Sequence, residues 1–207
     1  MKEDILEQLV DDYLKSQGYF TSHNVKFKPD PKHKDFVSNQ DSVASDIDIL
    51  AVHPKKIGAD RVVAVTCKSW QTGFNPSALI KAIETNGKVG GKIAWKSFRE
   101  LKEPKWSSAY CKKIEEMTGS KKFKYWTAVT KVNGDPMVWE NHKAFQINLN
   151  GNKIVLKTVR QLLDEMHPLI GTTVEPSQVE RLLKVIKASE WSIPAPGAPM
   201  KSKRRKT

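Results

Sequence analysis

Two short apolar segments carry the residues of this chain that could do chemistry. Residues 45–52 read SDIDILAV and residues 62–70 read VVAVTCKSW, and both patterns are typical of buried β-strands. Asp48 lies within the first segment, and Lys68 lies near the end of the second. A carboxylate and an amine on neighbouring strands can hold a divalent cation and a water molecule against a phosphodiester. This pair therefore indicates the minimal equipment of a metal-dependent nuclease.

Each of the two residues also has a purely structural interpretation. An acid between Ile47 and Ile49 is costly if it is buried without a partner, but an exposed strand face would accept Asp48. Lys68 could be an edge-strand lysine that prevents sheets from pairing edge to edge. The five histidines are scattered, and the two cysteines form no CxxC motif, so neither a histidine-based nuclease site nor a structural zinc is indicated.

The elements that must position this pair follow from hydrophobic periodicity and turn residues. Residues 2–17 have helical spacing that ends at Gly18, and Asn150-Gly151 suggests a β-hairpin. The pattern predicts strands at 19–27, 45–53, 61–68, 123–132, 145–148 and 153–157, a loop at 28–42, and helices at 75–86, 92–101, 107–117, 159–166 and 177–188. This order predicts an α/β fold in which a central mixed β-sheet is flanked by helices.

Length and composition bound the organisation of the chain. Its 207 residues suit one domain with an appendage, and we expect an α/β domain at 1–170, a helical extension at 171–192 and a disordered basic tail at 193–207. No run is long and apolar enough for a membrane span, and the acidic, amphipathic start does not resemble a signal peptide. Two cysteines favour a reducing compartment, so a cytoplasmic protein without a membrane partner is expected.

The net charge of +12 points to a polyanionic partner, and DNA is the expected one. Residues 96–124 contain nine Lys or Arg against four Glu, interleaved with aromatic residues, and 201–207 contain five Lys or Arg and no acid. The alternative is that many of these side chains only solvate the surface. The residues predicted to contact nucleic acid are Lys92, Lys96, Arg99, Lys102, Lys105, Lys203, Arg204 and Arg205.

Three segments, in this order, resemble the PD-(D/E)xK nuclease superfamily, and most closely its Mrr-like restriction endonucleases. Residues 6–19 (LEQLVDDYLKSQGY) are similar to the first helix of that family. Residues 46–51 (DIDILA) and 63–70 (VAVTCKSW) are similar to its two catalytic strands. The resemblance covers about residues 3–90 and implies a restriction-endonuclease-like core.

The resemblance implies a catalytic set of Glu7, Asp48 and Lys68. It also implies that Asp48, Glu7 and the main-chain carbonyl of Cys67 bind Mg²⁺, for which Mn²⁺ would substitute. The chain departs from the family at Thr66, where a carboxylate or Gln is usual. A hydroxyl is a weak ligand for Mg²⁺, so Asp46 is a candidate substitute, although a solvent-facing role for Asp46 is the alternative. Glu7 could equally be a first-turn acid favoured by the helix dipole.

These inferences predict a Mg²⁺-dependent endodeoxyribonuclease that restricts foreign DNA. A DNA-repair or junction-resolving nuclease is an alternative within the same chemistry. A catalytically inactive nuclease fold that binds DNA, or an assembly subunit of a larger nuclease, is the alternative from a different class. The protein could act as a homodimer, because cutting both strands of a duplex commonly requires two active sites.

Overall fold

The protein is built around a five-stranded mixed sheet. The computed structural model describes residues 4–169 and 177–189. Along the sheet the order is β1 (Phe20–Phe27), β2 (Ser45–Val52), β3 (Val62–Lys68), β6 (Lys124–Val129) and β7 (Lys153–Thr158). The first three strands are antiparallel neighbours, whereas β3, β6 and β7 run parallel. The expected α/β class with a central mixed sheet is therefore confirmed.

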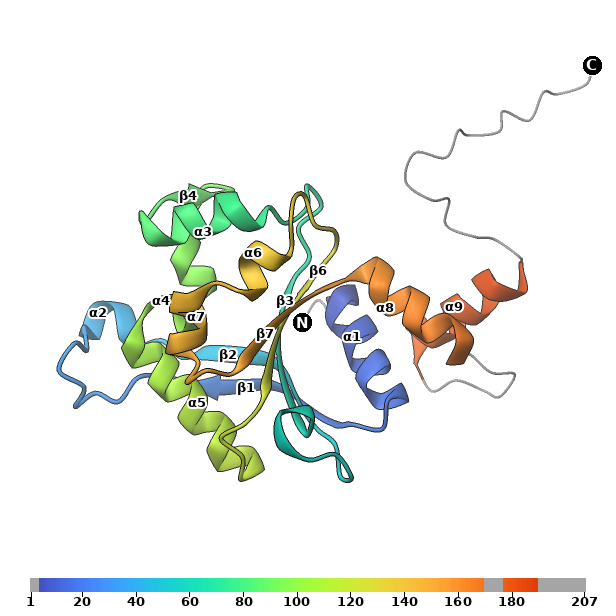
Figure 1. Cartoon of the computed structure of the whole chain (residues 1–207), viewed down its shortest axis with the longest axis horizontal. Helices are drawn as coiled ribbons and strands as arrows, with labels where there is room; N and C mark the ends of the chain where they lie inside the picture. Colours follow the sequence, from blue (N-terminus) through green and yellow to red (C-terminus); the bar gives the residue numbers. More distant parts are fainter. Residues whose placement is uncertain (1–3, 170–176, 190–207) are drawn as a thin grey trace, which may run out of the picture.

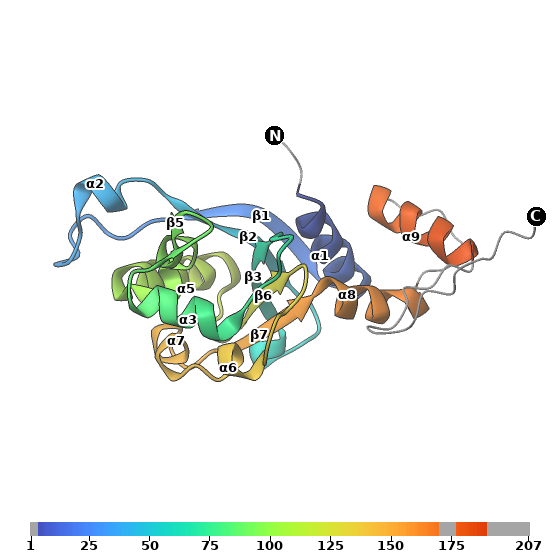
Figure 2. The same ribbon diagram turned by 90° about the horizontal axis from the view of Figure 1, so that it is seen from above.

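Helices cover both faces of this sheet (Figures 1 and 2). One face carries α1 (Ile5–Ser16) and α8 (Val159–Met166), with α9 (Gln178–Ala188) packed against α1. The other face carries α3 (Pro76–Glu84), α4 (Arg99–Lys102), α5 (Pro104–Thr118), α6 (Met137–Glu140) and α7 (Lys143–Asn148). The short elements are α2 (Ser38–Asp41), the β4 (Lys88–Val89) and β5 (Lys92–Ile93) ribbon, and single 3₁₀ turns at Gly58–Asp60, Ala94–Ser97 and His167–Leu169.

The strand β3 shows why the chain folds into three layers. Its residues alternate between two hydrophobic cores, so Val62 and Ala64 pack toward α3–α7 while Val63 and Val65 pack toward α1. A strand buried on both faces needs a continuous apolar run, and residues 62–65 supply one. The strand therefore lies at the centre of the sheet, and its last residues emerge between the two helical layers.

One predicted hairpin is wrong. Residues 145–148 belong to the helix α7 and do not form a strand beside β7. Asn150 and Gly151 both have positive φ, 54° and 74°, and the Gly151 N–H donates to the carbonyl of Gln146 at 2.8 Å. This is the geometry of a helix C-terminus, which favours the same Asn-Gly pair as a tight hairpin turn.

The prediction of a helix at 92–101 is also partly wrong. Lys92–Ile93 pair with β4 in a two-stranded ribbon, and only Arg99–Lys102 form an α-helix. Gly90 and Gly91 both have positive φ and form the turn of that ribbon. The loop predicted at 28–42 contains the one-turn helix α2.

The other predicted elements are found close to their expected ranges. In the C-terminal region, α9 lies within the extension expected at 171–192, and Val179 and Leu183 pack against the core on the α1 side. The proposed boundary at 170 and the basic tail at 193–207 lie outside the described residues.

Candidate functional site

The strands β2 and β3 diverge at the position of Asp48. Their antiparallel pairing runs from Val52–Val62 to Ile49–Val65 and ends there. Beyond that point Ser45–Ile47 stay paired with β1, while Thr66–Lys68 stay paired with β6. The sheet therefore forks, and we call the space between the separating ends of β2 and β3 the fork.

The side chain of Asp48 lies in the fork and takes the place of a main-chain hydrogen-bond partner for β3. Its carboxylate Oδ2 accepts the main-chain N–H of Cys67 at 2.6 Å. That N–H points toward β2 and would otherwise lack a sheet partner, so the carboxylate satisfies it. The bond explains how an acid is tolerated between two buried isoleucines.

The backbone around Asp48 is also irregular. Ile47 packs into the core beneath α3–α7, whereas Ile49 packs into the core beneath α1, although two residues apart on a regular strand face the same way. On the neighbouring strand Asn24 lies opposite Asp48 and has φ of 51°, in the left-handed region. The in–out alternation therefore breaks at Asp48 and turns this carboxylate toward β3.

Lys68 joins the fork through Thr66. The Lys68 ammonium donates to Thr66 Oγ1 at 3.0 Å, and that hydroxyl lies 3.4 Å from Asp48 Oδ2, to which it donates. The ammonium also lies 5.4 Å from the centre of the Phe98 ring. Thr66 is buried, so a neutral hydroxyl connects the carboxylate and the amine at the position where the resemblance leads one to expect a carboxylate.

The N-terminus of α1 brings Glu7 to the same place. Asp4 caps this helix by accepting the Leu6 N–H at 2.8 Å, and its second oxygen accepts the Ser69 hydroxyl at 2.9 Å. This contact ties the start of α1 to the residue that follows Lys68. Burial, and next the charges of Asp48, Asp4 and Asp46, raise the pKa of Glu7 to about 6, while Lys68 opposes the rise. The charges of Asp48 and Lys68 both act on Glu7, so this carboxylate lies in the electrostatic environment of the fork.

Asp46 lies two residues before Asp48 on β2. Its carboxylate forms an exposed ion pair of 2.7 Å with Lys26, its register partner on β1. Burial raises the pKa of Asp48, and Asp46 adds to the rise, whereas Lys68 and the Cys67 N–H oppose it. Asp46 therefore acts on the site through its charge.

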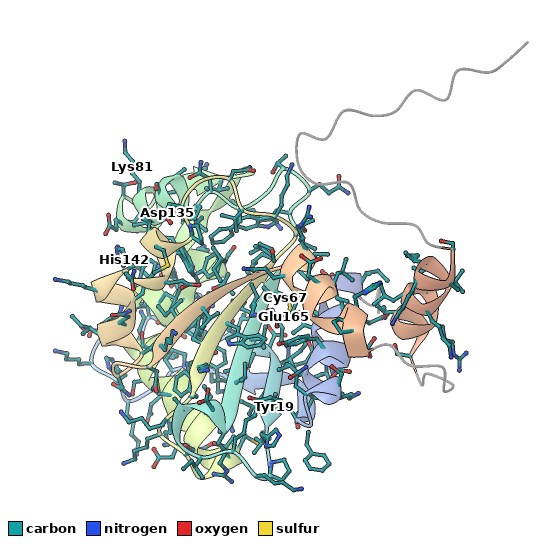
Figure 3. The ribbon with its side chains drawn as sticks, turned by 45° about the vertical axis from the view of Figure 1, so that its right-hand side comes forward. Tyr19, Cys67, Lys81, Asp135, His142 and Glu165 are labelled. Atoms are coloured by element: carbon teal, nitrogen blue, oxygen red, sulfur yellow. The ribbon has the colours of Figure 1, made fainter. Side chains whose placement is uncertain are left out.

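The main chain of Cys67 faces the fork, whereas its side chain packs in the core. The thiol packs with the α1-side residues, and burial raises its pKa well above the ordinary value. Figure 3 shows Cys67 on the side of α1 and α8, near Glu165, while Lys81, Asp135 and His142 lie in the opposite layer. In a strand the N–H and C=O of one residue point to the same neighbour, so the Cys67 carbonyl also faces the fork.

These donors suit only one kind of metal site. Within 4–169 and 177–189, no three His, Cys, Asp or Glu side chains are grouped closely enough to hold a metal ion. Two carboxylates, Glu7 and Asp48, remain with the Cys67 carbonyl, and described residues hydrogen-bond to Asp48 only at Oδ2. Mg²⁺ commonly keeps several waters and binds one or two carboxylates together with substrate phosphates. The donor set therefore fits Mg²⁺ shared with a substrate, and it does not fit an all-protein cage.

A buried acid that the sequence analysis did not single out lies behind Lys68. Glu100 on α4 is buried, and the Tyr125 hydroxyl donates to its carboxylate at 2.5 Å. Burial raises the pKa of Glu100, while this hydrogen bond and the charge of Lys68 oppose the rise. A lone Glu in a short helix carries no sequence pattern that could have indicated this position.

The basic residues predicted to bind nucleic acid are not equivalent. Lys92 and Lys96 are exposed, the Arg99 guanidinium lies 4.7 Å from the Trp106 ring centre, and Lys102 donates to the Glu84 carbonyl at 3.2 Å. The prediction is wrong for Lys105, which is buried and forms an ion pair of 2.8 Å with Asp41. Lys203, Arg204 and Arg205 lie outside the described residues.

Comparison with known proteins adds no assignment. In the described part of the chain no helix is both long and apolar enough to cross a membrane. The chain matches no protein-family model, no curated protein and no solved structure.

Proposed function

We propose that this protein is a metal-dependent endonuclease with a PD-(D/E)xK core that hydrolyses phosphodiester bonds in DNA. The observation that supports the proposal is the chain of contacts from Asp48 through Thr66 to Lys68 where β2 and β3 diverge, with Glu7 under the influence of both charges. Two carboxylates with raised pKa and a lysine amine are the groups needed to bind a divalent cation and direct a water molecule at a phosphate.

Each residue has a distinct role in the proposed reaction. Asp48 and Glu7, with the carbonyl of Cys67, would hold Mg²⁺. When bound, this ion would polarise the scissile phosphate and lower the pKa of its water. Lys68 would orient the attacking water and offset charge on the phosphate, and the Thr66 hydroxyl would fix its ammonium near Asp48. Glu100 would hold the Tyr125 hydroxyl behind this site, and burial raises the pKa of its carboxyl.

The substrate class rests on charge. A net charge of +12 favours a polyanion, and phosphate contacts dominate affinity for nucleic acid. Restriction of foreign DNA is the first proposed role because the resemblance is closest to the Mrr-like restriction enzymes. DNA repair or junction resolution would use the same chemistry.

A second candidate is a DNA-binding protein with an inactive nuclease fold. The specific observation in its favour is Thr66, a buried neutral side chain where the family usually supplies a metal ligand. Loss of one ligand weakens Mg²⁺ binding in the absence of substrate, because fewer charged oxygens are available.

Plasmid nicking separates the two candidates. Purified protein is incubated with supercoiled DNA in Mg²⁺, Mn²⁺ or EDTA, and Asp48→Asn is compared with Asp164→Asn. Asp164 is a matched control because its carboxylate is exposed on α8 and, among the described residues, forms an ion pair with Arg160 alone, at 3.6 Å. The nuclease requires metal-dependent nicking that Asp48→Asn abolishes and Asp164→Asn keeps. DNA binding without nicking in either metal would instead identify the binding module.

A further inference from the structure

We infer that a lysine-lined groove between α5 and the loop that follows β1 binds the sugar–phosphate backbone of DNA. This inference deepens the proposed function, because it assigns the surface that holds the substrate. The groove has a volume of about 790 Å³ and opens between residues 26–33 and the outward face of α5. None of its exposed lysines is among the individual residues predicted to contact nucleic acid, although Lys112 and Lys113 belong to the basic stretch at 96–124.

Charge is concentrated on both walls of this groove. Lys28 and Lys32 lie on the loop wall, and Lys112 and Lys113 lie on the helix wall. Only two carboxylates, Asp30 and Glu116, line the same space. Lys113 pairs with Glu116 at 2.9 Å, whereas no described carboxylate lies within ion-pair distance of Lys28, Lys32 or Lys112. Three ammonium groups are therefore available to phosphate oxygens.

The walls are held in place by the buried pair of Lys105 and Asp41. Lys105 on α5 also donates to the Asp35 carbonyl at 2.9 Å, so the helix is fastened to the loop at two points. Asp41 in turn accepts the Trp106 indole N–H at 3.0 Å and the Val37 N–H at 2.8 Å. A groove with fixed walls loses little conformational entropy on binding. Lys105 thus shapes the groove without contacting a phosphate.

One ion pair links the groove to the strand that carries Asp48, although Glu7, Asp48 and Lys68 do not themselves line the groove. Lys26 lines the groove and pairs with Asp46, which lies two residues from Asp48 on β2. Figure 2 shows β1 and β2 running from the sheet into the loop that carries α2, and the groove residues 26–33 continue from the end of β1 into that loop. A strand of DNA in the groove would therefore lead toward the fork.

A second hollow extends the basic surface across α5. It has a volume of about 620 Å³, shares Ser108 and Lys112 with the groove, and is also lined by Lys122 and by Lys121, which pairs with Glu115 at 3.6 Å. Two adjoining basic hollows suit a polymer with regularly spaced phosphates better than one small anion. No large hydrophobic side chain is exposed among the residues that line the groove, since Phe27 is only 4% exposed, whereas binding to a lipid surface uses an exposed face of such side chains.

Fluorescence anisotropy of the full chain with a labelled 20-base-pair duplex in EDTA tests this inference. The triple variant Lys28→Ala, Lys32→Ala, Lys112→Ala is compared with Lys55→Ala, Lys81→Ala, Lys143→Ala, which removes three exposed lysines outside both hollows. Lys81 lies on the outer side of α3 in Figure 3. The groove variant should lose roughly 10- to 100-fold in affinity, and its log–log salt slope should fall by about 2 to 3, because three phosphate contacts are removed.

The control variant should lose much less affinity than the groove variant. Equal losses in the two triple variants would overturn the inference, because total charge alone would then explain binding. Absence of duplex binding by the natural chain, or binding only to vesicles of anionic phospholipid, would also overturn it. Since EDTA prevents metal-dependent cleavage, these results are independent of the nicking assay. If the natural chain nicks DNA but the groove variant binds the duplex as tightly as the natural chain does, the proposed function stands and the groove is not the DNA-binding surface.

Discussion

The carboxylate of Asp48 accepts the main-chain N–H of Cys67 at 2.6 Å, although the β-ladder between their strands ends at Ile49 and Val65. This single contact holds the separating strands β2 and β3 at a defined distance. It also anchors a carboxylate that is linked to Lys68 through the Thr66 hydroxyl and whose charge raises the pKa of Glu7. The site thus depends on a place where regular sheet structure stops.

Glu7 should titrate in a pH range where most glutamates are already ionised. We expect a pKa of about 6, against an ordinary value of 4.5, in carboxyl-carbon NMR of the metal-free protein. Protonation of this group favours folding, so its contribution to stability grows as pH falls through about 6 toward 4.5. Metal binding has the opposite dependence, because Mg²⁺ requires the ionised carboxylate. Adding Mg²⁺ should therefore lower the titration midpoint.

The variant Asp48→Asn provides the matched test of that titration. It removes the largest electrostatic cause of the shift, so the pKa of Glu7 should fall while its burial persists. The variant Asp164→Asn should leave the midpoint unchanged. An unaltered Glu7 midpoint in Asp48→Asn would show that the two carboxylates do not share a site.

Thr66→Glu should strengthen metal binding. The hydroxyl of Thr66 already lies between Asp48 and Lys68, so a carboxylate there would add a charged ligand beside Asp48. Calorimetric titration with Mn²⁺ should show tighter binding than in the natural chain. Thr66→Gln has the same size without the charge and should not reproduce the gain. Equal affinities in the two variants would mean that position 66 does not reach the metal.

Lys105→Met should destabilise the fold strongly. The variant leaves the buried carboxylate of Asp41 without its ion-pair partner, and breaking such a pair costs about 3–5 kcal/mol. Urea unfolding followed by circular dichroism measures the loss. Lys102→Met serves as the control, because Lys102 makes only an exposed hydrogen bond, and its effect should stay below about 1 kcal/mol. Similar losses in the two variants would contradict a structural role for Lys105.

The same pair gives a pH dependence with a defined sign. Burial would raise the pKa of Asp41, but hydrogen bonds from Lys105, the Val37 N–H and Trp106 outweigh it and lower the pKa below 3.8. Stability from this carboxylate is thus fully present above its ordinary pKa and is lost as pH falls through the lower folded value. Lys105→Met should weaken this acid dependence, since it removes one of the lowering contacts.

The sequence by itself determined the five strands of the central sheet, the first helix and the short list of candidate site residues. Runs such as residues 62–65 are apolar at every position, and that local property already requires burial on both faces. Asp48 and Lys68 stand out for a related reason, because a charge inside an apolar strand needs a partner or solvent. Such signals are local, so they can be read from the order of the residues.

Tertiary structure alone decided which partners those residues have. Asn150-Gly151 suits a hairpin and a helix end equally, and packing of α7 against α4 selects the second. Lys105 looks like any other lysine in a basic stretch until α5 meets Asp41 from a loop more than 60 residues away. The fork itself requires β2 and β3 to separate in space, and no local pattern of residues encodes where a ladder between two strands ends.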